Sequence, residues 1–314
     1  MINALEVGEA CGIKVCMGAS TGDMLVDDQD ALDQIFEHAP VIVVTHCEDS
    51  PMIWANEARA KEKYGDDVPL TEHPGIRSAE ACLKSSTLAT GLARKHDALL
   101  HVLHLTTAIE MDLFSPAHRS EKRITAEVCV HHLWFDESRY DELGTRIKCN
   151  PAIKRAEDRE ALVAALNDGR IDIVATDHAP HTADEKNNPY FKAPAGLPLV
   201  QHAVQVLFDL AARGSISHEL IVDRVCHAPA DIFGVEERGY VREGYFADLV
   251  IIDPDKPVTV DSADVLYKCG WSPFEGHTFT SSIDTTIVNG EVVWKNGALT
   301  GAIAGKRLNF SRPR

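Results

Sequence analysis

Residues 41–46 read VIVVTH, a nearly continuous apolar run that ends in a histidine. A strand that is apolar on both sides is typical of a parallel sheet whose two faces are both covered. The same pattern recurs at residues 98–105 (ALLHVLHL) and 171–177 (IDIVATD). These runs therefore predict buried parallel strands, each with a polar residue at or near its C-terminal end.

Further segments fit between and around these strands. Residues 13–17 and 124–130 are strand candidates, and helical stretches are predicted at 28–38, 78–95, 158–167, 197–212 and 216–228. Strands that alternate with helices at this spacing predict a parallel α/β sheet, either doubly wound or closed into a (β/α)8 barrel. The sequence contains neither a Gly-x-Gly-x-x-Gly turn after a strand nor a P-loop, so little favours nucleotide binding.

The pattern changes after about residue 240. Residues 246–252 form a strand candidate, and residues 284–288 and 291–294 flank Asn289-Gly290, a strong signal for a two-residue hairpin. The sequence thus predicts two parts, an α/β barrel over residues 1–239 and a small β-sandwich module over residues 240–314.

Composition excludes several classes of protein. The 314 residues are 45% hydrophobic and 25% charged, with a net charge of −17, so nucleic acid and anionic membranes are poor partners. No apolar run reaches the roughly 18–20 residues of a membrane span, and the first residues do not resemble a signal peptide. The eight cysteines form no Cys-x-x-Cys pair and lie in apolar segments, as expected of reduced thiols in a cytosolic protein.

Potential metal ligands recur in or at the ends of the predicted strands. Active sites of barrels are built at the C-terminal ends of the strands. Several polar groups buried there without partners would be costly, and a metal ion would satisfy them together. The candidate ligands are Lys14, His46, His104 and Asp177.

Side-chain alternation along a strand distinguishes candidate ligands from histidines on the opposite face. In an extended strand Leu100, Val102 and His104 share one face, whereas His101 points to the other. We therefore expect His104 to be a ligand and His101 to pack outside as a structural histidine. Of the adjacent His131 and His132, one could support the ligands from outside, or both could be structural.

Lys14 and Asp177 require separate arguments. A protonated lysine cannot bind a cation, but a desolvated neutral amine can take up carbon dioxide and become a carbamate that bridges two metals. The alternative is a lysine that extends to solvent at the strand end. Asp177 can both bind a metal and carry a proton, His181 is free to contact substrate, and His178 is a supporting residue.

Several segments resemble dihydroorotases of the amidohydrolase superfamily, in the right order over essentially the whole chain. The most specific are residues 150–154 (NPAIK) and 176–181 (TDHAPH). The others are residues 13–26 (IKVCMGASTGDMLV), 45–49 (THCED), 103–107 (LHLTT) and 268–276 (KCGWSPFEG).

The resemblance implies a TIM-type (β/α)8 metallo-dependent hydrolase barrel, with a β-sandwich assembled from both chain ends. It also implies two Zn²⁺ ions bridged by carbamylated Lys14, with Asp177 on the first ion and His46 and His104 on the second. The residues that would hold the substrate are Asn150, His181, Ala195 and Gly196.

One departure from the family is large. Family members carry a His-x-His pair on the first barrel strand, and none occurs in these 314 residues. We therefore expect the N-terminal barrel strands to be missing, either because the chain is a fragment or because it is naturally shortened. Smaller departures are Cys16, Ala19 and Asp23, which we expect to tune function.

The implied activity is the reversible, metal-dependent hydrolysis of dihydroorotate to N-carbamoyl-aspartate in cytoplasmic pyrimidine biosynthesis. Family members are often dimers, so a homodimer is a candidate assembly. Two alternatives stay open. One is another cyclic-amide hydrolase, such as a hydantoinase or an allantoinase. The other is a non-catalytic dihydroorotase-like subunit, which the absence of His-x-His favours.

Overall fold

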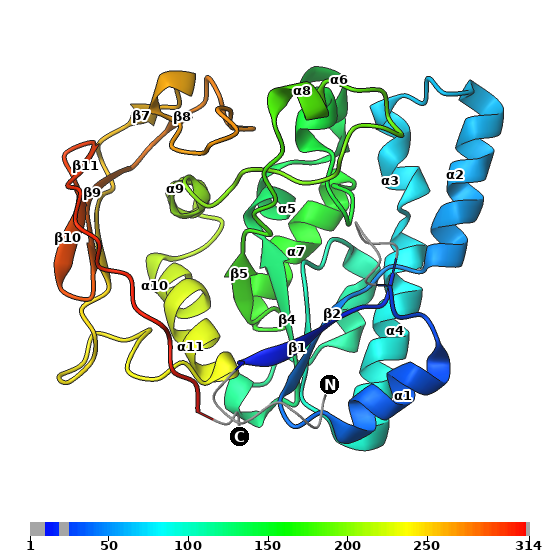
Figure 1. The fold of residues 1–314 in the computed structure, drawn as a ribbon, viewed down its shortest axis with the longest axis horizontal. Helices are drawn as coiled ribbons and strands as arrows, with labels where there is room; N and C mark the ends of the chain where they lie inside the picture. The colour runs from blue at the N-terminus through cyan, green and yellow to red at the C-terminus, as the bar shows by residue number, and fades with distance from the viewer. Residues whose placement is uncertain (1–9, 19–24, 312–314) are drawn as a thin grey trace.

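The computed structural model describes residues 10–18 and 25–311. Its centre is a parallel five-stranded sheet in which the strands follow one another in chain order (Figure 1). Because the strands are parallel, their C-terminal ends meet at one edge of the sheet, as predicted. The strands are β1 (Gly12–Cys16), β2 (Ile42–His46), β3 (Leu100–Val102), β4 (Ile124–Cys129) and β5 (Ile173–Ala175).

The helices that connect the strands include those predicted at residues 28–38, 78–95 and 158–167, and four that were not predicted, α2, α3, α5 and α6. The longer helices are α1 (Gln29–His38), α2 (Ser50–Tyr64), α4 (Ala79–His96), α7 (Ala156–Asp168) and α9 (Ala203–Ala212). The shorter ones are α3 (His73–Ile76), α5 (Val130–Trp134), α6 (Tyr140–Leu143), α8 (Ala183–Lys186), α10 (His218–Val222) and α11 (Ala228–Phe233). Short 3-10 helices are η2 (Leu70–Glu72), η3 (Ala108–Leu113), η4 (Arg119–Glu121), η5 (Glu137–Arg139), η6 (Gly144–Ile147) and η8 (Ser262–Asp264), and η7 (Asp223–His227) is a π-helical turn.

The two faces of the sheet have different neighbours. Leu100 and Val102 belong to the main core, which includes Leu32 and Phe36 of α1. On the other face Ile42 of β2 and Ile173 of β5 pack with residues of α11. The sheet therefore has one face against α1 and α4 and a second face that α11 partly covers.

His101 lies on this second face, which corrects the expectation that it packs outside. Its register partners are Val44 on β2 and Thr125 on β4, and paired residues of a parallel ladder point to the same side. The His101 ring bonds Thr125 Oγ1 at 2.9 Å and Glu127 Oε2 at 3.1 Å. It is fully buried and satisfied, as a structural histidine, but it faces the side opposite the main core.

The C-terminal part is the small β module that the sequence predicted. Asn289 and Gly290, with φ of 50° and 85°, form the predicted turn between β9 and β10. Figure 1 shows this sheet at the opposite side of the molecule from α2. The four-stranded sheet contains β11 (Ala298–Leu299), β10 (Glu291–Lys295), β9 (Ser282–Val288) and β6 (Leu249–Asp253), and a separate ladder pairs β7 (Val258–Thr259) with β8 (Thr278–Phe279). A domain boundary after residue 239 stays a prediction.

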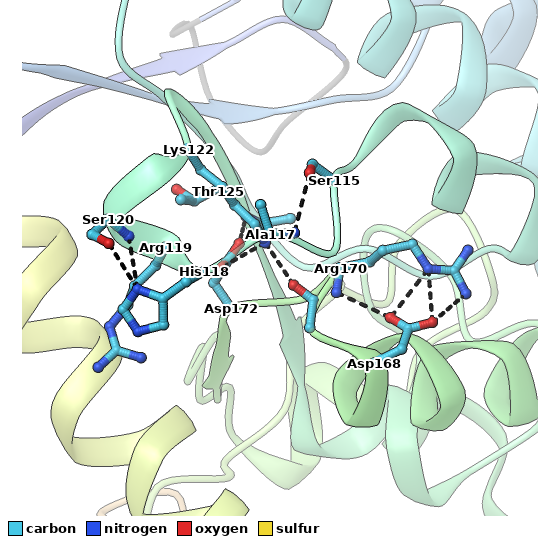
Figure 2. A network of polar contacts seen from close by, with 12 residues as sticks. Ser115, Ala117, His118, Arg119, Ser120, Lys122, Thr125, Asp168, Arg170 and Asp172 are labelled. Atoms are coloured by element: carbon cyan, nitrogen blue, oxygen red, sulfur yellow. Dashed lines mark hydrogen bonds and ion pairs between the residues drawn. The ribbon is translucent and has the colours of Figure 1, made fainter.

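A buried ion pair joins the N-terminal ends of β4 and β5 (Figure 2). Lys122 Nζ lies 2.8 Å from Asp172 Oδ1 and 2.6 Å from the carbonyl oxygen of Gly169. The second carboxylate oxygen of Asp172 accepts from the backbone N–H of Ala126 at 3.1 Å. The N-terminal face of such a sheet serves stability rather than chemistry.

No helix in the described ranges combines the length and apolarity needed to cross a membrane. Ala19 and Asp23 fall outside the described residues.

Candidate metal and substrate site

Two of the predicted ligands have an unusual backbone conformation. His104 has φ of +38° and Asp177 has φ of +45°, and each lies two residues after the last residue of its strand. Positive φ is uncommon for residues other than glycine and costs free energy, and such residues cluster at functional sites. The chain therefore leaves the extended conformation where it presents these two side chains.

This change of direction brings His104 to His46. Nδ1 of His46 lies 3.0 Å from Nε2 of His104, and the two rings meet edge to face. Both residues are buried, with 5% and 3% of their surface exposed. Two residues that are 58 positions apart in the chain therefore point ring nitrogens at one place beyond the ends of β2 and β3.

Glu48 orients the His46 ring by contacting Nε2, the ring nitrogen that does not face His104. This residue was not identified from the sequence. Its Oε2 lies 3.0 Å from Nε2 of His46 and 3.2 Å from Nη1 of Arg77. Burial opposes its charge, but Arg77 and His46 hold the pKa of Glu48 down to about 2. An ionised carboxylate fixes the proton of His46 on Nε2, which leaves the lone pair of Nδ1 free. Its position two residues after His46 was the available signal.

These nitrogens fit a divalent metal ion. Zinc binds imidazole nitrogen at about 2.0–2.1 Å, so two nitrogens on one ion lie roughly 3 Å apart. The separation of His46 Nδ1 and His104 Nε2 matches that spacing. Nδ1 of His104 is buried and has no hydrogen-bond partner among the described residues, so either ring nitrogen can carry its proton.

Asp177 lies near these histidines but is itself exposed. Burial and the neighbouring His46 lower the pKa of His104, and the charge of Asp177 opposes that shift. Burial likewise lowers the pKa of His131 to about 4, and the charge of Asp177 again opposes the shift. Asp177 is thus a solvent-accessible carboxylate within electrostatic reach of two neutral, buried imidazoles.

Lys14 does not have the environment that its predicted carbamate assumed. It is exposed, whereas His46 and His104 are buried. It lies on β1, the edge strand of the five-stranded sheet, so solvent reaches its side chain. Its register partner Val44 precedes His46 by two positions, which puts Lys14 on the same face as His46. Its participation in the site stays a prediction.

The structure brings most of the predicted substrate-binding residues together. Ring Nε2 of His181 lies 3.2 Å from the carbonyl oxygen of Ala195. Gly196 has φ of +138°, and a Cβ there would lie 2.5 Å from the carbonyl oxygen of Ala179. The loop at Ala195 and Gly196 therefore packs directly against the segment that follows Asp177.

Two buried lysines, Lys186 and Lys148, donate hydrogen bonds to backbone carbonyl oxygens in and around this loop. Neither was identified from the sequence. Nζ of Lys186 donates to the carbonyl oxygens of Lys148, Pro194 and Gly196 at 2.8–3.1 Å. Burial lowers the pKa of Lys186 to about 7. Nζ of Lys148 in turn donates to the carbonyl oxygens of Tyr190 and Ala193. Nothing in the sequence pattern distinguished these lysines from surface lysines.

The side chain of Asn150 has an acceptor without a partner. Its Oδ1 is buried and unpartnered among the described residues. The preceding carbonyl, of Cys149, accepts from Nε2 of His73 at 2.8 Å, and Nδ1 of His73 lies 2.8 Å from the hydroxyl of Tyr190. Asn150 is thus held by a buried network, with its carbonyl oxygen left for another group.

Cys129, His131 and His132 form a second group of potential ligands at the end of β4. Their ligand atoms all lie within 4.8 Å of one another, and all three residues are buried. Sequence reasoning considered the two histidines but not the cysteine, which it placed with the structural thiols.

Comparisons with known proteins agree with this architecture. A model of the amidohydrolase family matches residues 28–293. Dihydroorotase from Halobacterium salinarum is 34% identical over 298 residues, which are 94% of this chain and 67% of that protein. Dihydroorotase from Bacillus cytotoxicus is 34% identical over 81% of this chain and 58% of its own length. The chain thus spans about three fifths to two thirds of these relatives.

Solved structures with the same fold include hydantoinases. L-hydantoinase from Arthrobacter aurescens superposes with a TM-score of 0.85 at 26% identity and covers 93% of this chain and 66% of its own. D-hydantoinase from a Thermus species gives a TM-score of 0.87 at 22% identity, over 98% of this chain and 68% of its own. The five parallel strands are thus part of the TIM-type barrel fold that the sequence predicted. The two relatives described above are dihydroorotases, and the chain belongs to the amidohydrolase family.

Proposed function

We propose that the protein is a dihydroorotase, which hydrolyses the cyclic amide of dihydroorotate to N-carbamoyl-aspartate and also closes the ring in pyrimidine biosynthesis in the cytoplasm. The observation that carries the proposal is the pair of ring nitrogens of His46 and His104, 3.0 Å apart and backed by Glu48. The relatives named dihydroorotase, at 31–34% identity, support this choice of substrate.

The residues that would hold metal divide between two ions. His46 and His104 would hold one Zn²⁺ and Asp177 would hold the other, and Lys14, which would first have to become a carbamate, is the remaining candidate ligand. When bound, the ions supply Lewis acidity, which polarises the amide carbonyl and makes water acidic enough to attack near neutral pH. Glu48 fixes the His46 tautomer, so that Nδ1 keeps its lone pair for the ion.

Asp177 would move the proton. Its carboxylate is exposed, so it can take a proton from the attacking water and return it to the leaving ring nitrogen. Its positive φ changes the direction in which the side chain leaves the backbone at the strand end. A histidine bound to metal through one nitrogen could not serve in this way.

The substrate would lie between Asp177 and the loop held by Lys186. His181 bonds the carbonyl oxygen of Ala195 through Nε2, which leaves Nδ1 for the ring, and Asn150 would offer its unpartnered Oδ1 to a ring N–H. Dihydroorotate carries a ring carboxylate, which uncharged cyclic amides lack, so the choice among substrates is a test of the proposal.

The test compares Asp177→Asn with Asp184→Asn, an exposed carboxylate on α8 that contributes nothing to the proposed site. We expect Asp177→Asn to lose at least about 100-fold in dihydroorotate turnover, within the range for loss of a general acid–base group. Asp184→Asn should keep wild-type turnover. Bound zinc, measured by elemental analysis, should include the ion on the histidine pair in both variants. Full turnover by Asp177→Asn would refute its assigned role.

Two alternatives have a specific observation behind them. The likeness to L-hydantoinase, at 26% identity, favours another cyclic-amide hydrolase, and hydrolysis of hydantoin or dihydrouracil in preference to dihydroorotate would establish it. The absence of His-x-His from the 314 residues favours a non-catalytic dihydroorotase-like subunit. Lack of turnover on every substrate, by zinc-loaded protein whose intact mass from its source cells is near 34.4 kDa, would favour the subunit.

A further inference from the structure

The end of β4 gathers a cysteine and two histidines that the proposed reaction does not use. Cys129 is the last residue of β4, and α5 begins at the next residue, so the chain turns sharply there. Cys129 pairs in register with Ala175 of β5, two residues before Asp177. The turn then places His131 and His132 beside the thiol, with their rings 4.0 Å apart between centroids.

These side chains are almost completely buried. The exposed fraction is 0% for Cys129, 1% for His131 and 4% for His132. Neither ring nitrogen of His131 has a hydrogen-bond partner among the described residues, nor does Nδ1 of His132. Buried polar atoms are nearly always paired in native proteins, so three unpaired nitrogens in one cluster indicate an absent partner.

One of these rings is already oriented for a ligand. Nε2 of His132 lies 3.1 Å from the carbonyl oxygen of Pro151, an acceptor that requires the proton on Nε2. Nδ1 of His132, which is buried and has no hydrogen-bond partner among the described residues, therefore keeps a free lone pair. A histidine that ligates a metal usually donates its other ring N–H to a carbonyl or carboxylate in this way.

We propose that Cys129, His131 and His132 form a binding site for a divalent transition metal of the zinc class. The ligand atoms all lie within 4.8 Å of one another, so small side-chain rotations bring them onto one ion. On binding, the thiol of Cys129 releases its proton to solvent, and the thiolate sulfur and two imidazole nitrogens bond to the ion. A thiolate with two imidazoles favours zinc or cobalt over magnesium or calcium.

This site neighbours the pair formed by His46 and His104, because His104 lies within electrostatic reach of His131, but the two differ in their donor atoms. That pair and its proposed partners contain only nitrogen and oxygen donors, whereas this site contains a sulfur donor. The inference does not rest on the proposed function, because metal binding here can be observed without any turnover.

Cobalt is the probe that separates the two sites. The purified protein is stripped with a chelator, titrated with Co²⁺ under reducing conditions and followed by absorption. A thiolate bound to Co²⁺ gives a charge-transfer band in the near ultraviolet, which nitrogen and oxygen ligands do not give. We expect the band in the wild type, its loss in Cys129→Ser, and its retention in Cys47→Ser, whose buried thiol contacts Thr45 instead.

Two further variants keep the test decisive. His131→Leu removes two unpaired buried nitrogens, so the metal-free protein should be at least as stable as the wild type. Its cobalt affinity at the thiolate site should fall by more than the roughly 10- to 100-fold that loss of a supporting contact costs. His104→Asn should lose cobalt elsewhere but keep the band, which separates failure of the catalytic site from failure of this one.

The outcomes divide cleanly. A band that depends on Cys129 and weakens in His131→Leu supports the site. No band in folded wild-type protein overturns the proposal, and so does a band that survives Cys129→Ser but disappears in Cys149→Ser.

Discussion

Replacing Lys122 with methionine should strongly destabilise the protein, because it leaves the charge of Asp172 buried. The side chains of the pair are only 2% and 1% exposed, and Nζ lies 2.8 Å from Oδ1. Removing one partner of such a pair costs about 3–5 kcal/mol. Typical domains have about 5–15 kcal/mol of stability in total, so the loss is easily measured. Equilibrium unfolding in guanidinium, followed by circular dichroism, gives the free energy of unfolding.

A second variant shows whether the charge is the cause. Lys122→Met/Asp172→Asn removes both charges, while the asparagine Oδ1 can still accept from the backbone N–H of Ala126. We expect this double variant to be about 2 kcal/mol more stable than Lys122→Met, although it carries one more substitution. A double variant no more stable than Lys122→Met, or a loss below about 1 kcal/mol in Lys122→Met, would refute the reasoning.

The pH dependence gives a third check on the same pair. Burial raises the pKa of Asp172 even with Lys122 present, and Lys122 opposes the shift. Without Lys122 the pKa should rise further. A carboxyl whose pKa is raised by folding favours the folded state at low pH and loses that contribution as pH increases through the folded-state pKa. The deficit of Lys122→Met relative to wild type should therefore be smaller at pH 5 than at pH 8.

Three further predictions concern the candidate site. Glu48 has a pKa of about 2 against an ordinary 4.5, so its charge should add roughly 3 kcal/mol to the free energy of unfolding above pH 4.5. That contribution should be lost as the pH falls from 4.5 towards 2. Acid unfolding of Glu48→Gln, followed by circular dichroism, should lack this pH dependence. Gly196→Ala should raise KM for dihydroorotate at least about 10-fold by displacing the loop, while Gly75→Ala, with open space around it, should leave KM unchanged. Lys186→Met removes a donor from three carbonyl oxygens, of which that of Lys148 keeps the backbone N–H of Gly196. It should lower Tm by several degrees and raise KM, as thermal unfolding and steady-state kinetics would show.

Much of the fold could be predicted because the buried strands carry their signal locally. Residues 41–46 are apolar on both faces, and they form β2 from Ile42 to His46 as predicted. The hairpin at Asn289-Gly290 followed from turn chemistry alone. The missed helix α2 also had local signals, because Asp49 caps it by accepting from the N–H of Met52 and Pro51 lies in its first turn.

The candidate site was less predictable, because its residues lie where regular geometry stops. Alternation correctly separates His101 from Leu100 and Val102, but it assumes that the strand continues to His104. The strand ends at Val102, and a positive φ at His104 turns its side chain toward His46. Side-chain alternation carries no information about that turn. Because it takes His104 to continue the strand on the face of Leu100 and Val102, it assigns His101 to the outer face, which is wrong.

The same reasoning explains the difference between Glu48 and Lys14. Glu48 lies two residues beyond His46, and its neighbours Arg77 and His46 provide the charges that keep it ionised although it is completely buried. Lys14 lies on the same face as His46, but β1 is the edge strand of the sheet and leaves it in solvent. Sequence spacing can thus indicate which side of a strand a residue faces. Whether the amine of a lysine on that side is shielded from solvent depends on which strand lies next to it. That is a property of the assembled sheet.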